Sequence, residues 1–215
     1  QTMRMAGATT EADNRLPVGI QVGMGTRPTA VHKFFTQGDF QNTGNTLDVA
    51  IEGDGFFQVD VNGELMYTRA GSFKLNQDGT VVTANGYILQ PQFAVPAQTK
   101  TISISSSGHM AAIDAQGQEL AGAELPLYTF INPAGLDARG RNLYTPTEAS
   151  GDATEGVPGT DNVGTLAQGF LEMSNVEVVD EMVNMIVGQR AYEVNSKSIQ
   201  TSDSMLGIAV QLKRS

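Results

Sequence analysis

The sequence predicts a mainly β protein that carries one long α-helix at its C-terminal end. Between residues 46 and 130, short runs of alternating apolar and polar residues are separated by Asn62-Gly63, Asp78-Gly79 and Asn85-Gly86, which favour tight β-hairpins. From residue 173 to 214 the chain contains no proline, and its apolar residues recur at helical spacing. These observations indicate an extended N-terminal arm, a hairpin-rich β domain, a return segment and a projecting helix of the coiled-coil type.

The first 45 residues differ from the rest in composition. They are rich in Gly, Thr, Asn and Gln, their apolar residues are scattered, and Pro17 and Pro28 interrupt any regular pattern. Such a stretch favours turns and irregular structure over a packed element. We therefore expect residues 1–45 to form an extended arm or linker.

Residues 46–145 carry the signals of a β domain. Apolar and polar residues alternate from Val49 to Val61, which predicts one continuous strand with a buried face and a solvated face. Asn-Gly and Asp-Gly pairs supply the positive backbone φ angles that two-residue turns require. Turns at these pairs predict the cross-strand neighbours Val59–Met66, Gln58–Tyr67 and Leu75–Val82. We expect this domain to fold alone.

The stretch IEGDGFFQVDVNGE, residues 51–64, combines acidic residues with glycine, as many metal-binding loops do. A calcium loop of the EF-hand type needs a glutamate at its twelfth position, and counting from Asp60 that position is Gly71. His32 and His109 lie far apart with no third ligand candidate, so a zinc site is not indicated. The stretch therefore predicts a structural hairpin with solvated acids, and we predict no metal and no cofactor.

Glu52 and Asp54 raise the question of catalysis, because two carboxylates on one strand face could act on a glycosidic bond. Acids alternate in this way along many half-buried strands by chance. The sequence has no nucleophile elbow, no phosphate-binding loop and no dinucleotide-binding motif in a strand–helix context. We predict no catalytic residue and no enzymatic activity. A glycan hydrolase whose helix serves only for dimerisation is the alternative from a different functional class.

Residues 132–162 contain NPAGLDARGRN and SGDATEGVPGTDN, which are rich in Pro, Gly, Thr and Asp and show little periodicity. Such composition predicts a long loop that leaves the β domain. We place the end of the β domain at residue 145 and expect residues 146–172 to form the loop and a return segment that leads to the helix.

The final segment, residues 173–215, has the pattern of a long helix. Ser174 and Glu177 have the spacing of a capping box, which predicts that the helix begins at Ser174. A helix of about 40 residues would measure ~60 Å. Val178, Met185, Tyr192, Ile199 and Leu206 recur at seven-residue intervals, which is half of a coiled-coil seam. The companion positions include Gln189, Ser196 and Asp203, so packing in a larger bundle fits better than a two-stranded zipper.

This apolar stripe is the candidate functional surface. Apolar residues at helical spacing usually pack on their own domain, but a β domain of this size offers a face of only about 25–30 Å. The stripe is longer than that, so an exposed part of it indicates a partner. Gly188 supports close packing by a neighbour, because glycine inside a helix costs about 1 kcal/mol relative to alanine. The predicted self-assembly residues are Val178, Met182, Met185, Gly188, Tyr192, Ile199 and Leu206.

Composition excludes several classes of function. The 215 residues include 13 basic and 23 acidic side chains, and the resulting net charge of -10 has the wrong sign for binding nucleic acid. The chain has no cysteine, so disulfides, thiolate metal sites and cysteine nucleophiles are excluded. No basic and apolar leader resembles a signal peptide, and no apolar run is long enough to predict a membrane-spanning helix.

Two separate stretches resemble one family, the axial proteins of the bacterial flagellum, which form its rod and hook. The first runs from QGDFQNTGNTLDVAIEGDGFFQVDVNGE to GYILQP and contains LDVAI, GFF, YTR and GSF in the family's order. The second is LEMSNVEVVDEMVNMIVGQRAYEVNSKSI, which is similar to the family's C-terminal helix, above all in SNV and QRAYE. With GMGTRPTAVHKFFTQGD upstream, the chain most resembles the distal rod members.

The resemblance implies a structural subunit of the distal rod, which assembles with itself into a helical tube and transmits motor torque to the hook. It implies as partners the adjacent rod and hook subunits, the surrounding outer-membrane and peptidoglycan ring proteins, and the flagellar export apparatus. The implied location is the flagellar basal body across the periplasm, reached without a cleaved signal peptide. A hook or proximal-rod subunit is the alternative within the family.

The resemblance also implies an N-terminal helix that pairs with residues 174–213, and nothing like its NNLANVNT-type stretch precedes Gln1. We therefore expect the chain to be a truncated or processed form.

Overall fold

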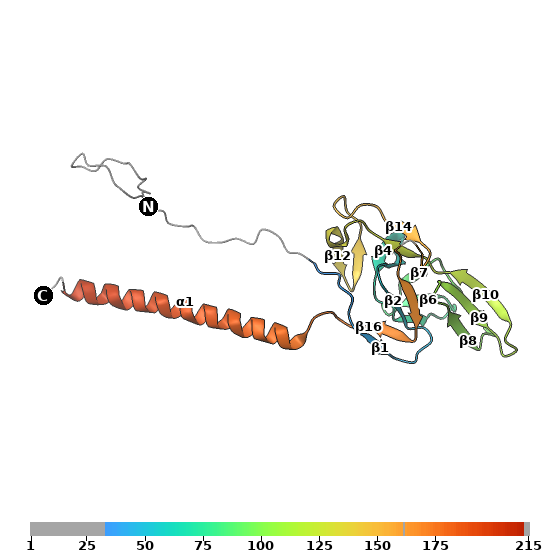
Figure 1. Ribbon diagram of the computed structural model, residues 1–215, viewed down its shortest axis with the longest axis horizontal. Coiled ribbons are helices and arrows are strands. Elements are labelled where there is room, and N and C mark those ends of the chain that lie inside the picture. The colour runs from blue at the N-terminus through green and yellow to red at the C-terminus, as the bar shows by residue number, and fades with distance from the viewer. Residues whose placement is uncertain (1–32, 161, 213–215) are drawn as a thin grey trace. The chain divides into compact units, whose positions relative to one another are not determined.

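The computed structural model of the protein describes residues 33–160 and 162–212, and within them the side chains of Leu206 and residues 209–212 lie outside the description (Figure 1). In this part of the chain the strands fall between residues 40 and 172, and the long helix α1 spans Val178–Leu212. The predicted fold class, mainly β with a long C-terminal helix, is confirmed. Residues 1–32, which make up most of the predicted arm, lie outside the described residues.

The largest sheet contains seven antiparallel strands in the order β12-β13-β4-β3-β7-β6-β5. Its strands are β12 (Asp137–Gly140), β13 (Leu143–Thr145), β4 (Glu64–Thr68), β3 (Phe57–Val61), β7 (Ile88–Gln90), β6 (Val81–Thr83) and β5 (Phe73–Leu75). The buried side chains Phe57, Val59 and Leu89 belong to its central strands. The sheet is therefore built mostly from one continuous stretch, residues 57–90, and completed by a hairpin from much later in the chain.

The turn between β3 and β4 follows the prediction. Asn62 and Gly63 have φ angles of 57° and 90°, as a two-residue turn of type I′ requires. Gln58 therefore pairs with Tyr67 and Val59 with Met66, so both predicted pairs are confirmed.

The next hairpin has a different register from the predicted one. Leu75 pairs with Val81 and Lys74 with Val82, so the predicted Leu75–Val82 pair is wrong. The reason is a longer loop: the Asn76 N–H donates to the Thr80 carbonyl at 3.0 Å, and only Gly79 has a positive φ, 76°. The Asn76 side chain also accepts hydrogen bonds from the Asp78 and Thr80 amides, which stabilises this loop.

The predicted continuous strand from Val49 to Val61 is two strands. β2 (Val49–Glu52) ends where Gly53 and Gly55 take φ angles of 107° and 151°, which side chains other than hydrogen disfavour, and β3 starts at Phe57. The predicted polar face is also wrong in part, because Ala50, Phe56 and Gln58 are buried. A strand with both faces covered cannot be recognised from simple alternation.

Smaller sheets complete the β region. β8 (Thr101–Ile104), β9 (His109–Ile113) and β10 (Glu119–Glu124) form a three-stranded antiparallel sheet (Figure 1). Three two-stranded ribbons pair β1 (Phe40–Asn42) with β16 (Phe170–Glu172), β2 with β15 (Thr165–Gln168), and β11 (Leu127–Thr129) with β14 (Thr154–Gly156). A short 3₁₀ helix, η1, covers Pro133–Gly135.

Residues 132–162 do not form the predicted long loop. They contribute η1, the hairpin of β12 and β13, and β14, and β13 pairs directly with β4. Local composition misled the prediction, because Arg141 and Asn142 form a tight turn with φ angles of 53° and 61° inside a run that resembles a loop. β1 likewise lies within the stretch predicted as arm, and it pairs with β16 just before the helix.

Two apolar clusters hold these strands together. The main core joins the inner faces of the sheets, and its fully buried side chains include Ile51, Phe57, Leu89, Met110 and Leu125. The second cluster consists of Phe56, Tyr67, Phe130 and Leu136, with Phe35 and Tyr144 packed at its margin. Its rings meet edge to face, for example Tyr67 and Phe130 with centroids 5.0 Å apart. Phe35 thus ties the start of the described chain to the β region.

Helix α1 begins at Val178, four residues later than predicted. The Glu177 carbonyl accepts the N–H of Glu181 at 3.1 Å, whereas the Ser174 hydroxyl accepts the N–H of Val176 at 3.2 Å and caps no helix amide. The capping-box prediction is therefore wrong, because Ser174 belongs to a segment that is bonded to the β region. Asp180 and Glu181 lie in the first turn, where negative charge stabilises a helix.

Candidate assembly surface

The predicted assembly residues lie on α1, and those with described side chains are exposed. Val178, Met182, Met185, Tyr192 and Ile199 are between 59% and 77% accessible to solvent. Gly188 is also exposed, and no atom lies within 4 Å of the place where a β-carbon would stand. Leu206 belongs to the helix, but its side chain lies outside the described residues. Burial against the β region therefore does not account for the described part of the stripe.

These positions share one side of the helix. At about 100° per residue, all seven predicted positions fall within an arc of ~120°. We call this side of α1 the first face. Glu181, Gln189 and Ser196 lie on it as well, so the first face is interrupted by polar residues.

A second apolar face lies on the other side of α1, centred about 150° from the first. Its large apolar residues are 52–65% exposed: Val179, Val183, Ile186, Val187, Val194, Met205 and Ile208. The predicted list does not contain them, because the seven-residue repeat selects only the first face. Spacings of three and four residues between Val179, Val183, Ile186 and Val187 are the signal that identifies this second face.

The remaining sector of α1 is polar. Asp180, Asn184, Asn195, Ser198 and Ser202 fall within it, and none of its described residues is large and apolar. Several hydroxyl groups on the helix bond to the preceding turn, as in the 2.9 Å bond from Ser202 Oγ to the Ser198 carbonyl. The helix therefore has two faces suited to packing and one suited to water.

The segment before α1 is fastened to the start of the described chain. The Asn175 side-chain amide lies 3.0 Å from the Thr36 carbonyl, 2.9 Å from the Thr36 hydroxyl and 3.3 Å from the Phe34 carbonyl. The Met173 N–H donates to the Asp39 carbonyl at 2.8 Å. We call residues 34–39 and 172–175, together with Arg69, the joint.

Arg69 is the centre of the joint. Its guanidinium donates to Glu172 Oε2 at 2.7 Å and to the carbonyls of Gly53 and Gly55 at 2.8 and 3.4 Å. Glu172 accepts the Gly38 N–H with its other oxygen at 3.1 Å. Arg69 and Glu172 retain only 16% and 12% of their side-chain accessibility, so water screens this ion pair weakly. Four chain segments therefore meet at the Arg69–Glu172 ion pair, next to the segment that leads into α1.

The acidic residues considered for catalysis lie on either side of the end of β2. Glu52 ends β2, and Asp54 lies beyond Gly53 in the break between strands, so they do not share one strand face. Within residues 33–160 and 162–212, no three His, Asp or Glu side chains gather as candidate metal ligands. In the same ranges no helix has the length and apolar character needed to cross a membrane.

Two family models match the chain. One is described as the flagellar hook protein FlgE/F/G D1 domain and matches residues 50–112, which contain β3 to β8 and most of β2 and β9. The other is described as the flagellar basal body rod FlgEFG protein C-terminal region and matches residues 167–212, which contain the joint's second half and α1. The two halves of the architecture thus match the same family independently.

Curated relatives agree with these models. The chain is 45% identical over 214 residues to the flagellar basal-body rod protein FlgG of Buchnera aphidicola subsp. Schizaphis graminum, covering 99% of this chain and 82% of the relative. It is 46% identical to FlgG of Borreliella burgdorferi, covering all of this chain and 82% of the relative. FlgG of Bacillus subtilis is 41% identical, with coverage of 97% and 80%. The chain belongs to the FlgE/F/G family of flagellar rod and hook proteins.

Proposed function

We propose that this chain is a structural subunit of the distal rod of the flagellar basal body, and that its copies assemble through α1 into a helical tube. The observation that carries the proposal is the 35-residue helix whose large apolar side chains are exposed on two faces. The family is one of structural rod proteins, and the relatives at 41–46% identity are named as basal-body rod proteins.

Two apolar faces fit a tube better than a dimer. A two-stranded zipper buries one seam per helix, whereas a helix inside a closed ring of parallel helices contacts a neighbour on each side. Burial of one large apolar side chain contributes about 1.5–3 kcal/mol. With several such residues on each face, association of α1 with neighbouring helices is strongly favoured, and the polar sector faces water.

The joint supports the proposed transmission of torque. A rotating tube must pass force from its helices to its outer β domains, and here the connection between α1 and the β region is reinforced by Arg69, Glu172 and Asn175. Further expected partners are adjacent rod and hook subunits, the rings that surround the rod, and the flagellar export apparatus. Labelling this protein and locating the label in purified basal bodies distinguishes a hook or proximal-rod subunit from a distal-rod subunit.

The test is to place a charge on the first face. Tyr192→Asp, expressed in cells that lack the unaltered protein, is expected to prevent rod completion, because a carboxylate would be buried against a neighbouring subunit. The matched control is Ser198→Asp on the polar sector, which is expected to give complete rods. Electron microscopy of purified basal bodies gives the readout.

Thermal unfolding of the purified protein separates assembly from folding. Since Tyr192 is 77% exposed in the single chain, Tyr192→Asp is expected to leave the β region's midpoint unchanged. The proposal would be contradicted by complete rods with Tyr192→Asp, or by a lowered unfolding midpoint of the β region in the isolated Tyr192→Asp protein.

A further inference from the structure

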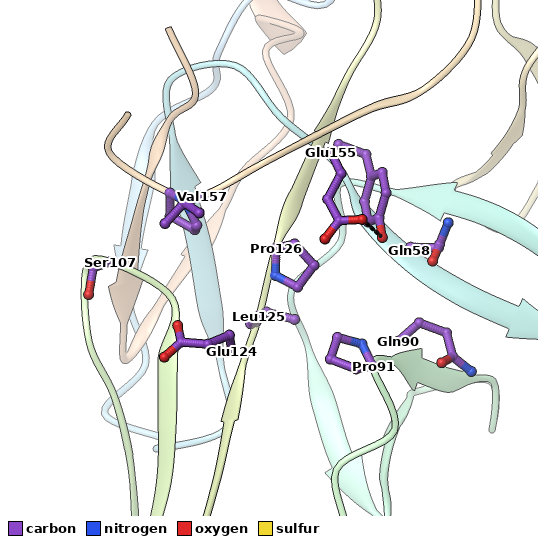
Figure 2. A pocket seen from close by; sticks show the side chains of 11 residues that line it. Gln58, Gln90, Pro91, Ser107, Glu124, Leu125, Pro126, Glu155 and Val157 are labelled. Carbon is purple, nitrogen blue, oxygen red and sulfur yellow. Dashed lines mark hydrogen bonds between the residues drawn. The ribbon is translucent and has the colours of Figure 1, made fainter. Parts of the chain in front are cut away.

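A groove lies between the three-stranded sheet and the seven-stranded sheet, and the assembly surface on α1 does not use it. Its volume is about 660 Å³. Figure 2 shows Glu124 and Ser107 on one side, Gln90 and Pro91 on the other, and Pro126 between them. Leu125, Val157 and Pro158 add apolar surface. The groove is thus apolar in its walls and polar at a few points.

The charge of the groove has one sign. Glu124 and Glu155 line it, and none of its lining residues is Lys or Arg. The Tyr128 hydroxyl donates to Glu155 Oε2 at 3.3 Å, and Glu124 Oε1 lies 2.9 Å from His109 Nδ1. Burial, with Glu155 nearby, raises the pKa of Tyr128 to about 12, so this hydroxyl remains a neutral donor near neutral pH. Two carboxylates with proline and tyrosine beside them fit a guanidinium, which is planar, weakly hydrated and suited to carboxylates.

The chain presents such groups on the hairpin of β12 and β13. Arg139 and Arg141 stand on either side of Gly140, next to a turn in which Gly140, Arg141 and Asn142 all have positive φ angles. Both arginines are exposed. β12 is an outer strand of the seven-stranded sheet, so its free edge faces away from the rest of that sheet.

Neither arginine occupies the groove of its own chain. Arg139 Nε lies 3.3 Å from Asp137 Oδ2 and donates to the Thr145 hydroxyl at 3.3 Å, and Arg141 Nη1 donates to the Tyr87 hydroxyl at 3.1 Å. Arg139, Asp137 and Arg141 are exposed, and an ion pair between exposed side chains, such as Arg139 with Asp137, contributes little to stability. The arginines are therefore able to exchange these partners for carboxylates on another molecule.

We propose that the β12–β13 hairpin of one copy docks its Arg139 and Arg141 into the groove of a neighbouring copy, against Glu124 and Glu155. The contact is head to tail, because hairpin and groove are different surfaces, and contacts of this type produce open helical assemblies when the rotation between copies does not close a ring. It also places positive charge against negative in a chain whose net charge is -10 and whose copies otherwise repel each other. The proposal rests on the proposed function, which brings many copies of the chain together.

Disulfide cross-linking tests the contact directly, because the chain has no cysteine. Ala138 is exposed beside the arginines and Ser107 is exposed at the groove, so Ala138→Cys with Ser107→Cys leaves all four charges in place. Oxidation of purified basal bodies that carry this double variant is expected to give a ladder of multimers of the chain. The controls are each single cysteine, and Ala138→Cys with Gln116→Cys at the exposed β9–β10 turn.

Exchanging the charges of the arginines and glutamates tests whether the contact depends on ion pairs between them. Arg139→Glu with Arg141→Glu, added to the cysteine pair, is expected to reduce the ladder about tenfold or more, the change that corresponds to losing one charge-assisted hydrogen bond. Adding Glu124→Arg and Glu155→Arg to the same chain is expected to restore it. Thermal unfolding of each variant verifies that the β region is folded.

Complete rods that contain the protein but give no ladder would overturn the docking contact and leave the proposed function intact. An adduct whose mass is not a multiple of this chain, or a disulfide within one chain, would also overturn it. Basal bodies that never contain the protein would instead contradict the proposed function.

Discussion

Arg69 connects segments that are far apart in the sequence through one side chain. Its partner Glu172 is 103 positions away, and its other two acceptors are backbone carbonyls at Gly53 and Gly55. These carbonyls are available because the strand breaks at the two glycines. The sequence identified YTR only as part of a family pattern, since no local spacing relates Arg69 to Glu172.

Removing the guanidinium is expected to destabilise the β region. Arg69→Ala leaves Glu172 partly buried without its charge partner, and removing one partner of a buried ion pair costs about 3–5 kcal/mol. Arg139→Ala is the matched control, because its ion pair with Asp137 is exposed and a change within about 0.5 kcal/mol is expected. Urea unfolding followed by circular dichroism measures both. Equal midpoints for the two variants would show that the joint contributes no stability.

His109 is expected to titrate above the usual range. The hydrogen bond that the His109 ring donates to the Glu124 carboxylate raises the pKa of His109 above 6.5, and the charge of Glu119 adds to the shift. Because the folded pKa exceeds the unfolded one, the resulting stabilisation is fully present below pH 6.5 and is lost as the pH rises through the folded pKa. An NMR titration of His109 gives the value, and Glu124→Gln is expected to move it back toward 6.5. A midpoint at or below 6.5 in the unaltered protein would contradict this.

Among the elements, the hairpins show which signals in the sequence were sufficient to predict the position of a turn and the register of its strands. Asn62-Gly63 gave the right register because both residues have positive φ and no extra residue enters the loop. At Asp78-Gly79 the same kind of dipeptide sits in a longer loop, because the Asn76 side chain bonds to two amides ahead of it. The dipeptides therefore predicted where the turns lie. The length of each loop depends on side-chain hydrogen bonds, and the local sequence pattern does not reveal these bonds.

The helix was predicted more completely than the strands. Its type, its length to within a few residues and its exposed first face all follow from periodicity, since a helix depends on its own backbone bonds. Its start was misplaced because Ser174 and Asn175 bond elsewhere. The residues of the second face were left out of the predicted assembly residues, because a strict seven-residue repeat does not select a face built at other spacings.

A substitution at Gly188 distinguishes the effect of close packing by a neighbouring helix from the effect of helix propensity. In the single chain nothing lies near the missing β-carbon, and leucine is a better helix former than glycine, so Gly188→Leu is expected to raise or maintain helix content. In the tube the added side chain would collide with a closely packed neighbour, and rods are expected to be incomplete. Ala191→Leu on the polar sector is the control. Circular dichroism and electron microscopy of basal bodies provide the readouts, and complete rods with Gly188→Leu would exclude close packing there.

At the scale of the whole molecule, the β region is closed by segments from both ends of its sequence. β2 pairs with β15, β1 with β16, and β13 with β4. Gln168 adds bonds to the carbonyls of Thr46 and Ile102 and to the amide of Ile104. Sequence pattern detects neighbours joined by a turn, but these pairings join strands whose paired residues are at least 75 positions apart in the sequence. Hence the domain end predicted at residue 145 cuts through one folded unit.

This arrangement predicts which part of the chain folds alone. A fragment of residues 34–176 keeps every strand pairing and omits α1, whose exposed side chains add nothing to the β core, so its unfolding midpoint is expected within ~5 °C of the full chain.

The fragment 46–145, expected from sequence to fold alone, lacks β1, β14, β15 and β16. Without β15, Leu166 no longer covers the fully buried Val49 and Ile51, and the edge of β2 loses its backbone partners. We expect no cooperative transition for 46–145 in thermal unfolding followed by circular dichroism. A cooperative transition near that of the full chain would mean that the long-range ribbons are accessory, and that the hairpins of residues 57–90 suffice to hold the core.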